Sequence, residues 1–214
     1  MTRIARLDSR ALVRVSGPDA RPFLHNLLTQ DVETLAPGEL RFGALLSPPG
    51  RLLFDLFLSG EADGVLLDVA ADRREALLQR LSMYRLRADV ALAPAGIGVR
   101  RGTGPAPEGA LPDPRHPALG WRLYGAGDGE DGTDWDALRV EHVIPETGIE
   151  LTPETYILEA GFERLNGVDF RKGCYVGQEV TARMKHRGLA KKRLMRVALE
   201  GAPPPPGAPI LLDG

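Results

Sequence analysis

Residues 41–58 read RFGALLSPPGRLLFDLFL and indicate a β-hairpin. Residues 41–46 and 52–58 are mostly apolar runs of a length typical of strands. Between them, residues 47–50 are Ser-Pro-Pro-Gly, and these residue types favour a tight turn. We therefore expect two neighbouring antiparallel strands joined by this turn.

Further strands and two helices are expected on either side of the hairpin. Apolar runs of strand length lie at residues 11–15, 65–70 and 88–93. Apolar residues at helical spacing follow a turn at residues 16–18: Ala20, Phe23, Leu24, Leu27 and Leu28. A second such stripe follows Asp72, a residue type that caps helices: Leu77, Leu78, Leu81 and Tyr84. The order β-α-β-β-β-α-β predicts an α+β fold of an antiparallel sheet with helices packed on one face.

The second half of the chain gives fewer local signals. Residues 95–117 are rich in Gly, Pro and Ala and predict a long exposed loop. Beyond it we expect a strand at residues 121–124 and a helix from Asp134 to about residue 143. Residues 192–200 have the pattern of another strand.

We divide the chain into three segments. Residues 1–94 form a first α+β subdomain, and residues 95–200 form a second that carries the only cysteine. Residues 201–214 contain four consecutive prolines and predict a stiff linker.

Composition narrows the class of protein. Apolar residues make up 43% of the 214 residues and charged residues 26%, which is ordinary for a soluble globular protein. No apolar run approaches the ~20 residues of a membrane span, and the N-terminus lacks a signal-peptide core. One cysteine excludes an internal disulfide and suits a reducing compartment, so we expect a cytoplasmic protein. Four scattered histidines and this cysteine give no metal-ligand spacing, so no metal site is expected.

The cysteine lies in a distinctive stretch, residues 171–180, which reads RKGCYVGQEV. Lys172 places a positive charge near Cys174, and positive charge favours the reactive thiolate. A helix is expected from about Gly177 to a stop at Gly188, with an apolar stripe of Val176, Val180 and Met184. By local chemistry alone, a lone cysteine is more often a small buried hydrophobe than a working thiol.

Residues 171–196 form a basic segment in a chain whose net charge is −2. Glu179 is the single acid in the segment, against nine basic residues: Arg171, Lys172, Arg183, Lys185, Arg187, Lys191, Lys192, Arg193 and Arg196. Such a run is usually a solvated helix face. The functional alternative is an anion site, for a folate polyglutamate tail or a nucleic-acid backbone.

Residues 172–179, KGCYVGQE, resemble the signature octapeptide of the YgfZ family. This family comprises folate-binding proteins that are related to the glycine-cleavage T-protein and linked to the maintenance of iron–sulfur proteins. The similarity continues through residues 181–188 and covers residues 14–20, 23–24 and 27–32 near the N-terminus. It implies a T-protein-like folate-binding fold, with the C-terminal β-barrel of relatives, which begins near residue 201, largely absent.

The resemblance also implies a function and a site. It implies a tetrahydrofolate-binding accessory protein that supports iron–sulfur cluster assembly or repair, with indirect effects on tRNA modification. Its partners would be folate and iron–sulfur proteins or their assembly machinery. Cys174 would carry the chemistry. Carboxylates would approach the pterin ring, and the motif region would line the folate cavity: Glu141 and Glu159, then Lys172, Gln178 and Arg183.

One departure from the T-protein pattern bears on the reaction. In T-protein aminomethyltransferases the second hairpin strand carries two adjacent aspartates. The first is the acid near the folate nitrogen that accepts the one-carbon unit. Here the pair is Phe54-Asp55, and a phenyl ring cannot transfer a proton. Asp55 is expected to point to the opposite face of the strand. The departure favours the YgfZ branch over aminomethyl transfer.

Two other functions stay open as alternatives. The first is a true aminomethyltransferase, because it would share the fold and the folate ligand. The second is an RNA-binding module that uses the basic segment. Only Tyr175 supplies an aromatic ring for base stacking near that segment, which ranks the RNA-binding function last.

Overall fold

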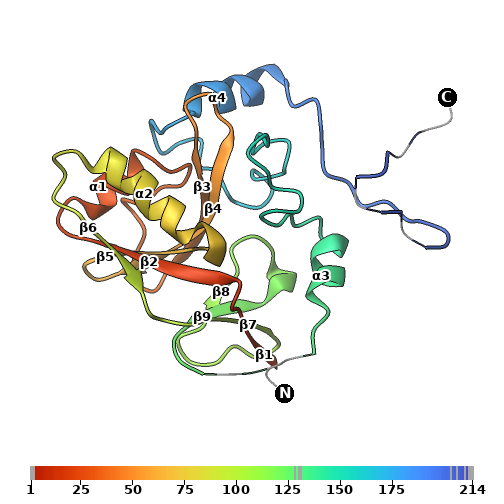
Figure 1. Ribbon diagram of the computed structural model, residues 1–214, viewed down its shortest axis with the longest axis horizontal. Helices are drawn as coiled ribbons and strands as arrows, with labels where there is room; N and C mark the ends of the chain where they lie inside the picture. The colour runs from red at the N-terminus through yellow and green to blue at the C-terminus, as the bar shows by residue number, and fades with distance from the viewer. Residues whose placement is uncertain are drawn as a thin grey trace.

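Two antiparallel sheets make up the framework of the protein (Figure 1). The computed structural model describes residues 3–127, 129, 132–202, 204–205, 207–209 and 211. The larger sheet has five strands in the order β3 (Leu40–Leu46), β4 (Leu52–Glu61), β5 (Gly64–Ala70), β2 (Arg10–Ser16) and β6 (Ala91–Ala95). The smaller sheet has four in the order β1 (Arg3–Arg6), β7 (Val99–Thr103), β9 (Trp121–Tyr124) and β8 (Leu111–Pro112).

The hairpin expected at residues 41–58 is confirmed as β3 and β4. The pair is antiparallel, with Leu45 opposite Phe54 and a shift of register between Leu45 and Leu46. All residues of β4 except the second, Leu53, and the last, Glu61, are buried, because both faces of the larger sheet are covered. A sheet covered on both faces requires apolar side chains at successive positions, which explains the continuous apolar run.

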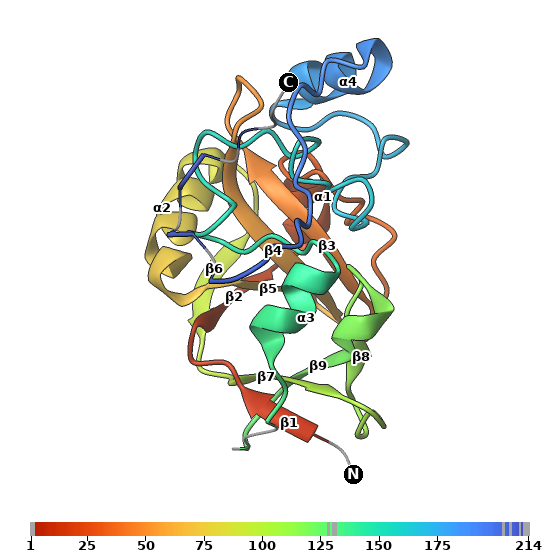
Figure 2. The same cartoon turned by 90° about the vertical axis from the view of Figure 1, so that its right-hand side faces the viewer.

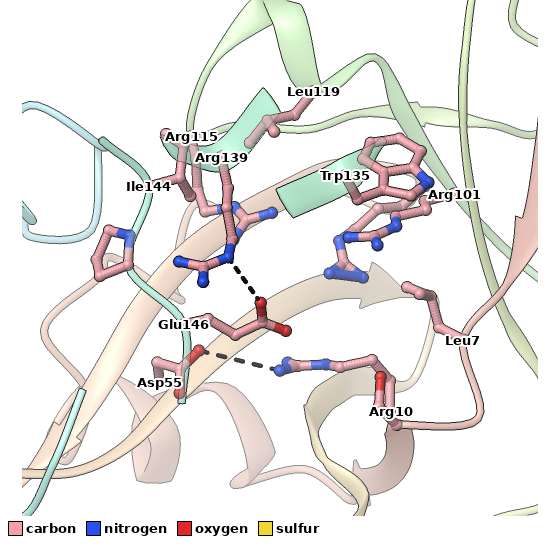
Figure 3. A pocket seen from close by; sticks show the side chains of 13 residues that line it. Leu7, Arg10, Asp55, Arg101, Arg115, Leu119, Trp135, Arg139, Ile144 and Glu146 are labelled. Atoms are coloured by element: carbon pink, nitrogen blue, oxygen red, sulfur yellow. Dashed lines mark ion pairs between the residues drawn. The ribbon is translucent and has the colours of Figure 1, made fainter. Parts of the chain in front are cut away.

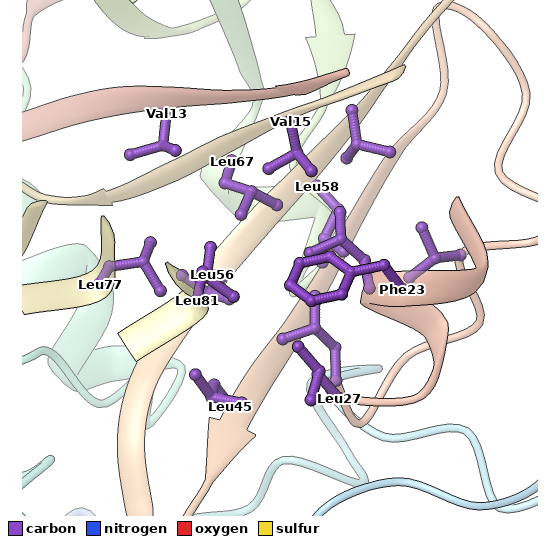
Figure 4. Packing of buried hydrophobic residues seen from close by; sticks show 14 of the residues in the cluster. Val13, Val15, Phe23, Leu27, Leu45, Leu56, Leu58, Leu67, Leu77 and Leu81 are labelled. Atoms are coloured by element: carbon purple, nitrogen blue, oxygen red, sulfur yellow. The ribbon is translucent and has the colours of Figure 1, made fainter. Parts of the chain in front are cut away.

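Helices α1 (Ala20–His25) and α2 (Arg74–Arg85) cover the first face of the larger sheet, as expected (Figure 1). Figure 4 shows the core between them, where Phe23 of α1 and Leu81 of α2 meet Leu56 and Leu67 of the sheet. Helix α1 ends sooner than the apolar stripe predicted. The chain leaves the helix so that Leu28 forms a β-bridge with Leu45 of β3.

Residues 144–175 cover the second face with turns rather than with a helix or sheet (Figures 1 and 2). Phe42 and Phe57 of the sheet pack here, and Phe162 of the covering segment lies 5.0 Å from Phe42 between ring centroids. Helices α3 (Trp135–Glu141) and α4 (Gln178–Arg187) flank this segment in sequence. Both helices confirm the expected positions, and Asp134 caps α3 by accepting the N–H of Ala137.

The smaller sheet corrects one expectation. Residues 95–117 are not one exposed loop, because β7 and β8 lie within them. Strand β7 pairs with β1 on one side and β9 on the other, so its partners come from distant parts of the sequence. The proposed boundary at residue 94 stays a prediction. Strand β1 comes from one side of that boundary, and its partner β7 comes from the other.

Residues 192–200 correct another expectation, because they form no strand. Met195, Val197 and Leu199 are exposed, and the described residues provide no sheet edge that pairs with this segment. The described part of the chain contains two open sheets and no closed barrel. Within that part, no helix has the length and apolar character needed to cross a bilayer.

Gly60, near the end of β4, provides a test of the packing between this strand and the loop before β3. A Cβ at this position would lie 2.1 Å from the backbone oxygen of Ala36, so the loop before β3 would have to move. Overpacking of this kind costs about 1–3 kcal/mol. We expect Gly60→Ala to lower the free energy of unfolding by that amount in urea denaturation. The matched control is Gly96→Ala, where a Cβ meets no atom within 4 Å. Equal stability of the two variants would contradict the packing.

Candidate functional site

Cys174 is a free, exposed thiol on the turn that leads into α4. Gly177, immediately before the helix, has a φ of 81°, which favours glycine. A Cβ on Gly177 would lie 2.7 Å from the backbone oxygen of Ser47. A Cβ on Gly50 would likewise lie 2.9 Å from the Cβ of Val180. The hairpin turn and the start of α4 are therefore in direct contact, and this contact positions the cysteine turn.

A reciprocal pair of hydrogen bonds joins the cysteine turn to α1. His25 Nε2 donates to the backbone oxygen of Lys172 at 2.8 Å, and Lys172 Nζ donates to the backbone oxygen of His25. His25 Nδ1 accepts the N–H of Val32 at 3.3 Å, which fixes the ring orientation. We call this pair the His25–Lys172 clamp. It connects residues 147 positions apart.

The residues after α1 hold the turn that precedes the cysteine. Thr29 Oγ1 donates to the backbone oxygen of Gly167 at 2.7 Å, and Gln30 Nε2 donates to that of Asn166 at 2.8 Å. The N–H of Asp169 donates to the backbone oxygen of Thr29 at 2.9 Å. The turn that carries Cys174 is thus anchored on both sides, while the thiol itself stays exposed.

Two of the predicted motif residues lie beside Cys174. Lys172 Nζ is 3.5 Å from the backbone oxygen of Cys174, and Gln178 Nε2 donates to the backbone oxygen of Gly173 at 2.9 Å. Burial lowers the pKa of Lys172, against the opposing effect of nearby acids such as Asp31. Arg183 is exposed on α4 and forms an ion pair with Glu179. The structure therefore groups Lys172 and Gln178 with the thiol, and it leaves Arg183 facing solvent.

A cavity of about 530 Å³ lies between α4 and the turns before it, and we call it the α4 cavity. Its volume falls within the ~300–1,000 Å³ that is typical of ligand sites. Its lining includes predicted site residue Glu159 and charged and apolar neighbours: Arg164, Met184, Lys185, Arg193 and Leu194. Glu159 Oε1 accepts the N–H groups of Lys191 at 3.2 Å and Lys192 at 3.3 Å.

The structure separates the two carboxylates that were predicted to meet the pterin. Glu159 lines the α4 cavity, whereas Glu141 is exposed at the last residue of α3 and is not among the residues that line it.

A second pocket lies between the two sheets, and we call it the arginine pocket (Figure 3). Its volume is only about 50 Å³. Five arginines, two acids and a tryptophan dominate its lining: Arg10, Arg101, Arg115, Arg122, Arg139, Asp55, Glu146 and Trp135. Sequence reasoning did not find this pocket, because its arginines come from five separate places in the chain.

The arginine pocket changes how the replacement of the first aspartate by Phe54 is interpreted. The side chains of Phe54 and Asp55 do point to opposite faces of β4, as expected. Phe54 is buried in the core under α1 and α2, however, and Asp55 is the one that faces the pocket. Asp55 accepts a hydrogen bond from Thr147 and lies 3.9 Å from Arg10. A phenyl ring at position 54 therefore does not remove the acid from the pocket side of the strand.

The clamp residue His25 and its neighbour Thr29 were not predicted as part of the site. The available signal was the presence of polar residues within and just after the apolar stripe of α1. Among the described residues, no group of three or more His, Cys, Asp or Glu is placed to hold a metal ion. Tyr175 is 7% exposed, so it offers no surface on which a nucleic-acid base could stack.

The clamp predicts how the cysteine turn responds to the loss of the Lys172 ammonium. A hydrogen bond to a charged group contributes about 1.5–3 kcal/mol. Lys172→Met should therefore raise the equilibrium population of the opened turn about 10-fold or more. We expect correspondingly faster amide hydrogen exchange at residues 173–176. The control is Arg171→Met, which removes an exposed cation next to it in the sequence. Equal exchange rates in the two variants would refute the clamp.

Comparison with known proteins places this geometry in context. No protein-family model matches the chain. The mitochondrial iron–sulfur cluster assembly factor IBA57 of Mus musculus is 35% identical over 94% of this chain and 68% of its own length. The Homo sapiens protein of the same name is 32% identical over 96% of this chain and 70% of its own length. The IBA57 homolog of Phaeosphaeria nodorum is 32% identical over 91% and 55% of the two lengths.

A solved structure supports the fold. The crystal structure of the glycine cleavage system aminomethyltransferase T from Bartonella henselae has a TM-score of 0.69 against this chain at 17% identity. The match covers 86% of this chain and 63% of the solved one. The expected T-protein-like fold of antiparallel sheets and packed helices is therefore confirmed.

Proposed function

The chain belongs to the family of the IBA57 iron–sulfur cluster assembly factors, and we propose that it acts as an accessory protein in the assembly or repair of iron–sulfur clusters. IBA57 factors are part of the wider YgfZ and T-protein-like family, so the resemblance seen in residues 172–179 is supported at the level of the family. The chain covers about two thirds of its mouse and human relatives, at 68% and 70%.

The exposed thiol of Cys174 is the observation that carries this proposal. A cluster such as [2Fe–2S] is held by four ligands, and Cys174 is the only cysteine of the chain. We therefore assign Cys174 one thiolate bond to a cluster whose remaining ligands come from a partner in the assembly machinery. The cluster is then cargo that is shared briefly between the two proteins. The clamp holds the turn still while the thiol stays accessible.

The charge around the thiol suits such cargo. An iron–sulfur cluster with its thiolate ligands is anionic, and cations near a binding site raise the local concentration of anions. Lys172 lies on the same turn, and Arg187, Lys191 and Lys192 are exposed at and after the end of α4. These residues would favour the approach of a cluster-loaded partner.

Tetrahydrofolate is the proposed small-molecule ligand, and the α4 cavity is the place that fits it. The arginine pocket, at about 50 Å³, is too small for a pterin, whereas the α4 cavity has about 530 Å³. A carboxylate such as Glu159 can accept the N–H groups on a pterin edge. Lys185 and Arg193 would pair with the carboxylates of the folate tail. When bound, reduced folate supplies a nitrogen that carries one-carbon units.

Aminomethyl transfer is a second candidate, and one observation favours it. Asp55 faces the arginine pocket, so it could supply the acid that the T-protein pattern places at position 54. The small volume of that pocket weighs against it, because folate and an aminomethyl donor would have to enter together. Tetrahydrofolate-dependent release of ammonia from an aminomethyl-lipoyl donor measures this activity directly, and robust turnover would replace the accessory role.

We propose a cytoplasmic location on the basis of the single free cysteine, which suits a reducing compartment. The mouse and human relatives are named as mitochondrial proteins, so cell fractionation is the relevant measurement. Loss of the protein would affect tRNA modification only through iron–sulfur enzymes that modify tRNA. Direct nucleic-acid binding by residues 171–196 would show as steeply salt-dependent affinity for RNA.

Replacement of the thiol tests the central assignment. In a strain that lacks the protein, we expect Cys174→Ala to restore iron–sulfur enzyme activity no better than an empty vector, because the thiolate ligand is gone. The control is His186→Ala, an exposed residue of α4, which should restore activity like the wild type. Circular dichroism of both variants checks that they fold. Full rescue by Cys174→Ala would remove the thiol from the mechanism.

Calorimetry with tetrahydrofolate tests the ligand and its location. A lost hydrogen bond to a charged group is worth about 1.5–3 kcal/mol, so Glu159→Gln should weaken binding about 10-fold or more. Glu141→Gln, at an exposed carboxylate outside the α4 cavity, should bind like the wild type. Cys174→Ala should also keep its affinity. Weaker binding by Glu141→Gln alone would contradict the assignment of folate to the α4 cavity. No binding by the wild type would contradict the folate role itself.

A further inference from the structure

The arginine pocket has the chemical character of an anion site, independent of the cysteine turn. Figure 3 shows the side chains of Arg10, Arg101 and Arg139 directed toward a common space between the two sheets. Arg115 and Arg122 also line it. Guanidinium groups carry fixed positive charge and several N–H donors, so five of them around one space create an environment that favours an anion.

The acids that neutralise Arg10, Arg115, Arg122 and Arg139 lie behind them. Asp68 accepts from Arg10 at 2.6 Å and from Arg122 at 2.8 Å. Asp113 accepts two hydrogen bonds from Arg115, and Glu150 accepts two from Arg139. These three acids are not among the residues that line the pocket.

The ion pairs orient the guanidinium groups in advance, so little reorganisation would be needed on binding. Burial and the arginines act in opposite directions on Asp113, and the arginines prevail, so the pKa of Asp113 lies below its ordinary value.

Two buried N–H donors of the pocket have no hydrogen-bond partner among the described protein atoms. Arg122 is 3% exposed, and its Nε lies 3.7 Å from Asp113 Oδ2, which is too far for a hydrogen bond. The indole Nε1 of Trp135 is likewise buried without an acceptor. Leaving a buried donor without an acceptor is costly, so an oxygen atom that came within hydrogen-bond distance of either group would be stabilised there.

Two acids on the pocket wall limit which anion can enter. Asp55 is engaged by Thr147 and lies 3.9 Å from Arg10, and Glu146 lies 3.5 Å from Arg139. A volume of about 50 Å³ holds a few water molecules or one small group and excludes a ring system. We propose that the arginine pocket binds a small oxyanion group, either a free ion of the size of phosphate or the terminal carboxylate of a larger molecule.

The two tryptophans of the chain provide a direct experiment. Trp121 Nε1 is also buried without a partner, but Trp121 does not line the pocket. In the variant Trp121→Phe, Trp135 becomes the single tryptophan of the full-length protein. We expect its fluorescence to change saturably when phosphate is added at constant ionic strength set with chloride.

Affinities from calorimetry separate a specific site from general charge attraction. Trp135→Phe keeps an aromatic ring but removes the indole N–H donor, so phosphate should bind about 2- to 10-fold more weakly. Trp121→Phe should bind like the wild type. Glu146→Gln removes an exposed negative charge from the wall, so phosphate should bind about 2- to 5-fold more tightly.

Parallel titrations with phosphate and acetate identify the source of the oxyanion. Saturation by phosphate supports a free tetrahedral ion, and saturation by acetate alone supports the carboxylate of a larger molecule. The proposal is overturned if neither produces a saturable change beyond matched chloride, which would indicate a water-filled pocket. Equal affinities of Trp135→Phe and Trp121→Phe would also overturn it.

Discussion

The arrangement of the two sheets depends on the ion pairs and hydrogen bonds made by the fully buried carboxylate of Asp68 in β5. It accepts hydrogen bonds from Arg10 at the start of β2, from Arg122 of β9 and from the hydroxyl of Tyr124. Removing one partner of a buried ion pair costs about 3–5 kcal/mol, so the smaller sheet must dock where Arg122 reaches Asp68. Although burial opposes it, Asp68 helps to raise the pKa of Arg10. The same ion pairs direct guanidinium groups into the arginine pocket.

The cysteine turn depends on the larger sheet in a different way. Residues 144–175 cover the second face of that sheet. Apolar packing binds them there without regular secondary structure. The end of α1 holds the turn through the His25–Lys172 clamp, and the hairpin turn packs against Gly177 and Val180. The thiol is thus carried by a firmly held backbone even though its own side chain is exposed.

The molecule therefore presents three separate candidate sites: the cysteine turn, the α4 cavity and the arginine pocket. Cys174 is exposed on the turn before α4, and neither it nor Lys172 or Gln178 is among the residues that line the α4 cavity. The arginine pocket is small and lies between the sheets, and it suits a small charged group. The Asp55 side chain lines the arginine pocket and Cys174 does not, which separates any acid–base chemistry at Asp55 from the thiol.

The sequence by itself determined the features that depend on local physics. The Ser-Pro-Pro-Gly turn and its apolar flanks predicted the β3–β4 hairpin, and the glycines at 177 and 188 bounded α4 correctly. The octapeptide around Cys174 indicated the family. Tertiary structure alone decided the pairing of β7 with β1, the failure of residues 192–200 to form a strand, and which face of β4 carries the pocket acid. It also created the clamp and the arginine pocket. These features rest on contacts between distant residues, up to 147 positions apart in the clamp, for which local propensity and spacing carry no signal.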